Sequence, residues 1–153
     1  FNIIQFELEG RRVLDLFAGT GQLGLEALSR GAEHCTFVDR RTEAASLVRE
    51  NIRLCRFEDR SRVVQGEAQA FLHSCGERFD VIFLDPPYKT DLLQQCVEKI
   101  ARFDILREHG IIVCESGTDW SVPTLTPPYE AGREYRYGQI KLTVCRRAGS
   151  VKR

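Results

Sequence analysis

The sequence predicts an α/β fold, in which a mostly parallel sheet has helices on both faces and ends in an antiparallel hairpin. Three observations predict it. Short apolar runs alternate with helical apolar patterns over roughly the first 115 residues. A glycine-rich stretch, "DLFAGTGQLG" (15–24), separates the first apolar run from the first helical pattern. Two strand-like segments then flank Gly138 near the end of the chain, as in a hairpin.

The expected parallel strands are short runs rich in aliphatic and aromatic residues. They are Arg12–Phe17, Cys35–Val38, Arg62–Val64, Asp80–Leu84 and Ile111–Glu115. Parallel neighbours need long crossover connections, which are nearly always right-handed. The intervening helices are therefore expected to cover both faces of the sheet, with the first and fourth strands as neighbours.

The expected helices carry apolar residues at helical spacing. The first has Leu23, Ala27 and Leu28 on one face and ends at Gly31 as a C-cap. The others are Thr42–Cys55, Ala68–Ser74 and Thr90–Phe103.

The last third of the chain abandons the strand–helix alternation. Tyr129–Tyr137 and Gln139–Arg146 are expected to form an antiparallel hairpin at the sheet edge. Ser121–Pro128 carries three prolines and is expected to be a loop.

Composition describes an ordinary globular chain. Its 153 residues are expected to form one domain (1–153), and 42% hydrophobic and 29% charged residues are typical of such a domain. Lys plus Arg and Asp plus Glu both number 22, so the net charge indicates no polyanion partner. The simplest expectation is a monomer.

The cysteines show no metal-site or disulfide pattern. The six lie far apart, without a CxxC pair or a Cys/His cluster, so we expect no metal. Several stand in apolar runs, which favours buried free thiols in a reducing, cytoplasmic setting. No apolar run reaches 18 residues, so no membrane span is expected.

The glycine-rich stretch contains Gly19-x-Gly21-x-x-Gly24 between a strand and a helix. Alone it is a weak signal of nucleotide-type binding, in which backbone approaches a ligand at a helix N-terminus. A tight turn that merely packs helix on strand is the structural alternative. As a binding loop it would use Phe17, Ala18, Gly19, Thr20 and Gly21.

Two aspartates narrow the choice of ligand. Asp15 stands four residues before Gly19, where it would repel a dinucleotide pyrophosphate and attract a cationic amino group and a sulfonium. S-adenosylmethionine is such a ligand. Asp39 ends the second strand and is placed to accept hydrogen bonds from both ribose hydroxyls, although a surface turn residue is the alternative.

The end of the third strand is the expected adenine side of the site. Gly66-Glu67-Ala68 lies there, with a helix-capping role for Glu67 as the equal alternative.

"FLDPPYK" (83–89) is the expected chemical end of the site. Asp85 and the Pro86 carbonyl would accept hydrogen bonds from an exocyclic amine, which favours a pyramidal nitrogen whose lone pair faces the methyl donor. Prolines hold that carbonyl in place, and Tyr88 offers a ring on which an extruded base can stack. A proline-rich turn with Tyr88 in the core is the alternative reading.

The chain resembles the N-methyltransferases with a (D/N)PPY motif, and more closely the bacterial family that methylates guanine N2 in small-subunit ribosomal RNA, the RsmD type. The segments that carry the resemblance are "VLDLFAGTGQLGLEALSRGA" (13–32), "FVDR" (37–40), "FDVIFLDPPY" (79–88) and "YRYGQIKLTVCRR" (135–147).

This resemblance implies a Rossmann-like class I methyltransferase with a seven-stranded sheet, S-adenosylmethionine as donor and a flipped guanine as acceptor. It assigns donor binding to Asp15, Gly19, Gly21 and Asp39. Arg40, the residue after Asp39, is also expected at the donor site. It assigns base binding to Asp85, Pro86 and Tyr88, and it names ribosomal RNA or the small subunit as partner. Family members usually carry a basic segment before the position of Phe1, so a native N-terminal segment is expected to be missing here.

Three other functions are alternatives to an RNA guanine-N2 methyltransferase. An adenine-N6 or other nucleic-acid amino-methyltransferase shares the motif logic, but DNA enzymes of that kind generally need a separate recognition region. An NAD-dependent oxidoreductase has only GxGxxG in its favour, and Asp15 opposes it. A non-catalytic scaffold would not need Asp85 and Tyr88.

Overall fold

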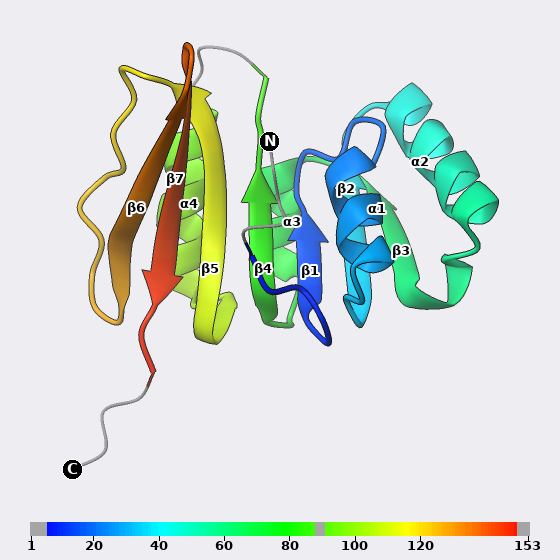
Figure 1. Cartoon of the computed structure of the whole chain (residues 1–153), viewed down its shortest axis with the longest axis horizontal. Helices are drawn as coiled ribbons and strands as arrows, with labels where there is room; N and C mark the ends of the chain where they lie inside the picture. The colour runs from blue at the N-terminus through cyan, green and yellow to red at the C-terminus, as the bar shows by residue number, and fades with distance from the viewer. Residues whose placement is uncertain (1–5, 88–90, 150–153) are drawn as a thin grey trace.

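The computed structural model describes residues 6–87 and 91–149, and Figure 1 shows their arrangement. Within this part the sheet has seven strands in the order β3-β2-β1-β4-β5-β7-β6. The strands are β1 (Arg12–Asp15), β2 (His34–Asp39), β3 (Ser61–Gln65), β4 (Phe79–Leu84), β5 (Leu106–Gly117), β6 (Tyr129–Tyr137) and β7 (Ile140–Arg147). The strands β1 to β5 pair in parallel, and β7 runs antiparallel to β5 and β6. The predicted class, the neighbouring first and fourth strands and the edge hairpin are confirmed.

Helices cover both faces of the sheet (Figure 1). They are α1 (Gln22–Ser29), α2 (Thr42–Cys55), α3 (Ala68–Ser74) and α4 (Leu92–Phe103), with a short 3₁₀ turn, η2 (Glu58–Arg60), before β3. Helices α1 and α2 share one core with Val13 and Phe83, whereas α3 and α4 share the other with Leu14 and Ile82. Alternate residues of each strand thus enter opposite cores, which explains why the central strands read as continuous apolar runs.

Helix α1 packs closely on β2 because residue 24 is glycine. A Cβ atom at Gly24 would lie 2.3 Å from Phe37 Cε2 and 2.7 Å from Cys35 Sγ. Both side chains are fully buried, so neither can withdraw easily. The third glycine of the motif therefore has a packing role that any side chain would oppose.

The element boundaries agree with the sequence except at a few ends. The bounds of α2, α3 and β6 are as predicted, and the first strand ends at Asp15 instead of Phe17. The fifth strand was predicted too short: β5 begins at Leu106 rather than Ile111. Its polar beginning includes His109, which has a φ of 64°, and the pairing with β4 shifts register there. Such an irregular stretch has no strand periodicity to read.

Two predictions at the start of α4 and in the hairpin need adjustment. Helix α4 begins at Leu92, and Thr90, where the helix was predicted to begin, lies outside the described residues. The second hairpin strand covers Ile140–Arg147, one residue later than predicted.

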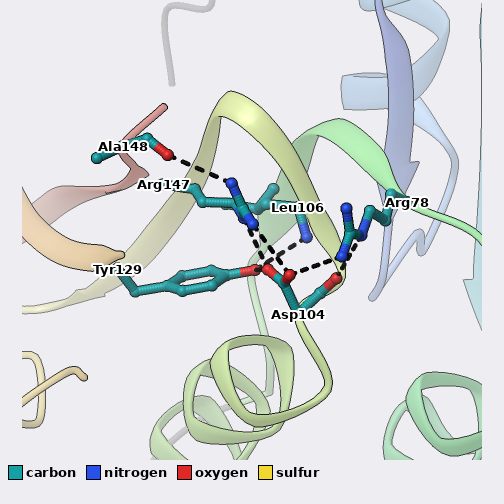
Figure 2. A network of polar contacts seen from close by, with 6 residues as sticks. All are labelled: Arg78, Asp104, Leu106, Tyr129, Arg147 and Ala148. Atoms are coloured by element: carbon teal, nitrogen blue, oxygen red, sulfur yellow. Dashed lines mark hydrogen bonds and ion pairs between the residues drawn. The ribbon is translucent and has the colours of Figure 1, made fainter. Parts of the chain in front are cut away.

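A polar network ties the hairpin to the body of the sheet (Figure 2). Asp104, which follows α4, accepts hydrogen bonds from Arg147 Nε at 2.7 Å and Arg147 Nη2 at 3.0 Å, and from Arg78 Nη2 at 2.7 Å. Tyr129 Oη donates to Asp104 Oδ1 at 2.8 Å and accepts from Leu106 N at 3.1 Å. One carboxylate therefore joins the start of β6, the end of β7 and the start of β5.

Candidate active site

The carboxyl ends of the parallel strands carry acidic residues at one edge of the sheet, which is the upper edge in Figure 1. Asp15 is the last residue of β1, Asp39 is the last of β2, and Asp85 follows β4 directly. Strand β1 lies between β2 and β4, so these three predicted residues converge. Ligands of open parallel sheets bind beyond such strand ends, at the point where the strand order reverses.

The glycine loop after β1 is held in place by both neighbouring strands. Ala18 N donates to Val38 O at 2.9 Å, and Leu16 N donates to Phe83 O at 3.2 Å. Asn51 on α2 donates from Nδ2 to Thr20 O at 2.9 Å. Phe17 is partly exposed. The loop is thus a braced turn beside β2 and β4.

The backbone at Gly19 is left-handed, which favours glycine, and open space lies beside this residue. Its φ of 58° lies in the left-handed region, and a Cβ atom there would meet nothing within 4 Å. Its N–H donates to Asp39 Oδ2 at 2.9 Å. The space over this loop therefore has room for a ligand, with a carboxylate at its edge.

Asp39 is an ionised carboxylate that accepts hydrogen bonds from Gly19 and Arg41. Burial alone raises its pKa, but the hydrogen bonds from Arg41 and from Gly19 N outweigh this, so the pKa of Asp39 is lowered overall. Arg41 N donates to Oδ1 at 2.9 Å. The Arg41 side chain also donates to this carboxylate, from Nε at 3.2 Å and from Nη2 at 3.5 Å, so its roughly four acceptor positions are occupied and two ribose hydroxyls would take the place of the exposed Arg41 side chain.

Asp15 is buried, with 2% of its surface exposed, and its Oδ2 accepts a hydrogen bond from Gly24 N at 3.1 Å. Burial, together with the nearby charges of Asp85 and Asp39, raises the pKa of Asp15 to about 7, against the lowering effect of the Gly24 N–H. It therefore braces the first turn of α1 and adds to the negative potential of the edge. That Asp15 faces a cationic donor stays a prediction.

The segment Gly66-Glu67-Ala68 lies next to Asp39, and its place at the adenine stays a prediction. Gly66 N donates to Asp39 O at 3.0 Å, and a Cβ atom at Gly66 would also meet open space. Ala68 is buried as the first residue of α3. Glu67 stands at the N-cap position without a side-chain capping bond, so the capping alternative is wrong. Its exposed side chain instead lies 3.9 Å from Arg40 Nη1.

The chemical end of the site is described up to Pro87. Asp85 is exposed and Pro86 is half-buried, so the carboxylate is not buried in the core. Asp15 pairs with Phe83 on β4, so Asp85 lies beside the strand that leads into the glycine loop, and its charge is one of the causes that raise the pKa of Asp15. Tyr88 lies outside the described residues, so its stacking role stays a prediction.

The sequence analysis missed Glu115. This half-buried residue lies on β5, where Leu84 pairs with Cys114, so it neighbours Asp85. Burial, followed by the hydrogen bond with Asp85 and the charge of Asp85, raises the pKa of Glu115 to about 7. The available signal was a carboxylate at the end of an apolar run, "IIVCE" (111–115), which repeats the pattern of "FVD" and "FLD".

The donor set suits an organic cationic ligand. Within residues 6–87 and 91–149, no group of three or more His, Cys, Asp or Glu could hold a metal ion. No helix in the described part of the chain is long and apolar enough to cross a membrane. Open glycine backbone, the ionised Asp39 carboxylate and the acidic edge fit the ribose and sulfonium of S-adenosylmethionine.

Known proteins with related sequences are methyltransferases by name. The model of the family described as Conserved hypothetical protein 95 matches residues 1–146. The "Putative rRNA methyltransferase YlbH" of Bacillus subtilis (strain 168) is 38% identical over 152 residues, covering 97% of this chain and 83% of that protein. The "Ribosomal RNA small subunit methyltransferase D" of Escherichia coli (strain K12) is 30% identical over 140 residues, covering 92% of this chain and 70% of that protein.

A solved structure has the same fold. "Putative methyltransferase yhhF from Escherichia coli" superposes with a TM-score of 0.87 at 28% identity, covering 97% of this chain and 82% of that one. Sequence and structure thus agree over nearly the whole chain.

Proposed function

The chain belongs to the family described as Conserved hypothetical protein 95, the RsmD-type methyltransferases, and we propose that it methylates the exocyclic N2 amine of a guanine in small-subunit ribosomal RNA. It is an S-adenosylmethionine-dependent methyltransferase with a Rossmann-like class I fold. We take residues 1–153 as one methyltransferase domain, acting as a monomer in the bacterial cytoplasm where ribosomes are made.

The glycine loop and the second strand form the donor side of the proposed site. S-adenosylmethionine supplies an electrophilic methyl group on a sulfonium. Asp39 accepts the ribose hydroxyls, and the backbone from Phe17 to Gly21 lines the ligand. Arg40 and the pair Glu67–Ala68 border the adenine. Asp15 holds α1 against the loop and contributes negative charge toward the cationic part of the donor.

The residues after β4 form the acceptor side. Asp85 and the Pro86 carbonyl accept the two amine N–H groups, which weakens delocalisation of the nitrogen lone pair into the guanine ring. Tyr88 stacks on the base. After transfer the nitrogen is cationic and loses its proton readily, so no strong base is needed and the histidines have no assigned role.

One observation carries this proposal most directly. Asp85, at the start of the DPP turn, lies beside the glycine-loop strand, because β1 and β4 are hydrogen-bonded neighbours with Asp15 paired to Phe83. This arrangement supports a methyl donor and a clamped amine on one rim. An NAD-dependent oxidoreductase gains nothing from it, since three carboxylates surround the loop that would hold a pyrophosphate.

A label-transfer assay tests the proposal. The protein is incubated with S-adenosylmethionine labelled in the methyl group and with one of four substrates: small subunits, deproteinised small-subunit RNA, large subunits or duplex DNA. We expect label in small-subunit RNA, recovered after digestion as N2-methylguanosine. Label only in DNA, only in large-subunit RNA, or recovered as N6-methyladenosine would overturn the proposed substrate.

A further inference from the structure

Glu115 has a position that the proposed function does not yet use. Strands β4 and β5 pair in parallel with Phe83 opposite Val113 and Leu84 opposite Cys114. Asp85 is the residue after Leu84, and Glu115 is the residue after Cys114. Phe83 and Val113 belong to the same core, so extended backbone brings Asp85 and Glu115 to that same face.

The two carboxyl groups do more than lie side by side. The side chain of Asp85 lies within hydrogen-bonding reach of Glu115, and this contact is one cause of the raised pKa of Glu115. Two ionised carboxylates have no proton to share and repel each other, so a hydrogen bond between them requires one proton on the pair. The raised pKa of Glu115, with burial as its main cause, makes Glu115 the residue that holds it.

Among the residues that the structure describes, three strands bring ionisable groups near Glu115. Asp85 follows β4, and Asp15 ends β1 on the far side of β4. On β7, Leu142 pairs with Glu115, and the next residue, Lys141, is buried with its Nζ 3.2 Å from Glu134 Oε2. Of these ionisable groups, the Asp85 carboxyl is the one in hydrogen-bonding contact with Glu115.

We propose that Glu115, brought beside Asp85 by the pairing of β4 with β5, is a positioning residue for methyl transfer: its carboxyl group hydrogen-bonds to Asp85 and fixes that carboxylate as an acceptor for the substrate amine. This inference rests on the proposed function of Asp85. One Asp85 oxygen is engaged by Glu115, and the other is aimed at the amine. Without the hydrogen bond from Glu115, the exposed Asp85 carboxylate can rotate. The rate of methyl transfer then falls steeply, because the acceptor of the amine hydrogen bond is misplaced.

The inference predicts a specific dependence on pH. Above about pH 7, Glu115 loses its proton, the pair becomes doubly ionised and the two side chains separate. The single-turnover rate at saturating donor and RNA is therefore expected to fall as the pH rises from 6 to 8.5. Glu115→Gln keeps an N–H donor that does not titrate, so its rate should stay within about threefold of wild type at pH 6 and lose the alkaline fall.

The experiment compares wild type, Glu115→Gln, Glu115→Asp and Glu98→Gln on small subunits or their RNA. Glu98→Gln, on the exposed side of α4, makes the same charge change away from the site and should reproduce the wild-type profile. Glu115→Asp is one methylene too short to reach Asp85 and should lower the rate about tenfold. All variants should bind S-adenosylhomocysteine within about twofold of wild type.

The outcomes separate the two proposals. A wild-type protein that labels no RNA would overturn the proposed function, and the positioning role with it. An active wild type whose pH profile is matched by Glu115→Gln would overturn the positioning role alone. If Glu115→Gln does not fold, Glu115→Asp decides: an unchanged rate contradicts the inference, and a lower rate with normal S-adenosylhomocysteine binding supports it.

Discussion

At the scale of single residues, acidic side chains gather at one rim of the sheet. Burying or crowding carboxyl groups is unfavourable unless hydrogen bonds or a cation compensate. Here hydrogen bonds compensate each carboxyl group in part. Asp15 accepts a hydrogen bond from Gly24 N, and Asp39 accepts from Gly19 N and Arg41 N. Glu115 is in hydrogen-bonding contact with Asp85. The remaining negative potential suits a ligand that carries a sulfonium.

Replacing Asp85 tests its role in the chemical step. Asp85→Ala should lower the single-turnover rate about 100-fold or more, because it removes an acceptor for the reacting amine. Affinity for S-adenosylhomocysteine, measured by calorimetry, should change less than about twofold. Asp59→Ala, an exposed aspartate in η2, is the matched control. A wild-type rate in Asp85→Ala would refute the assignment.

The raised pKa of Asp15 predicts that the preference for S-adenosylmethionine over S-adenosylhomocysteine depends on pH. The pKa of Asp15 is raised to about 7, mainly by burial, so Asp15 is neutral below that pH and ionised above it. S-adenosylmethionine carries a sulfonium and S-adenosylhomocysteine does not. Calorimetry of both ligands should therefore show relative affinity for the cation rising by about tenfold between pH 6 and pH 8.

Asp15→Asn provides the control for that titration. It keeps an acceptor oxygen for Gly24 N and removes the ionising group, so the preference should rise less steeply with pH. A ratio of affinities that stays flat in wild type would show that these carboxyls do not act on the donor.

At the scale of elements, the packing of α1 on β2 depends on Gly24. Gly24→Ala would place a Cβ atom 2.3 Å from Phe37 Cε2, so the helix must move away from the sheet. We expect thermal or urea unfolding to show a loss of about 1–3 kcal/mol, because strain exceeds the gain in helix propensity.

Two further variants test whether the clash with Phe37 causes the loss of stability. Gly66→Ala, where the new Cβ atom meets nothing within 4 Å, should change stability by less than about 0.5 kcal/mol. Phe37→Leu should cost less in the Gly24→Ala background than alone, because it removes the atoms that clash. A Gly24→Ala protein as stable as wild type would contradict the packing role.

At the scale of the whole molecule, Asp104 joins the C-terminal hairpin to the α/β body (Figure 2). It lies just before β5, at the edge where the parallel strands begin, opposite the acidic rim. The hydrogen bond from Arg147 is the main cause that lowers the pKa of Asp104 to about 2. The depressed pKa means that this stabilisation is present above about pH 4 and is lost as the pH falls toward 2.

That sign gives a test of global stability. Asp104→Asn should lower the free energy of unfolding by about 1–2 kcal/mol at pH 7, measured by urea denaturation, because it removes the charged partner of Arg147 and Arg78. The difference from wild type should shrink near pH 2.5, where Asp104 is partly protonated. A difference that is constant with pH would mean that charge is not the source of the stabilisation.

Much of the fold followed from local signals. Helix α2 has the predicted bounds because its apolar spacing is regular and the chain turns at Arg56, where the backbone is left-handed. The long β5 did not follow, since its start at Leu106 depends on pairing with Phe79 across a register shift. For the candidate site, the sequence predicted Asp15, Asp39 and Asp85, which the structure brings to one rim, and it did not predict the neighbouring Glu115.

The sequence by itself determined which residues stand at the ends of strands, because periodicity, glycine spacing and the DPP turn are local patterns. The fold class also predicted that the first and fourth strands are neighbours, which places Asp85 beside Asp15. Only the tertiary structure decided that the end of the fifth strand, with Glu115, lies beside Asp85. The order β3-β2-β1-β4-β5 places Asp85 beside Asp15 on one side and Glu115 on the other. The physical reason is that strand neighbours are selected by pairing between segments far apart in the chain, and that selection has no local sequence pattern.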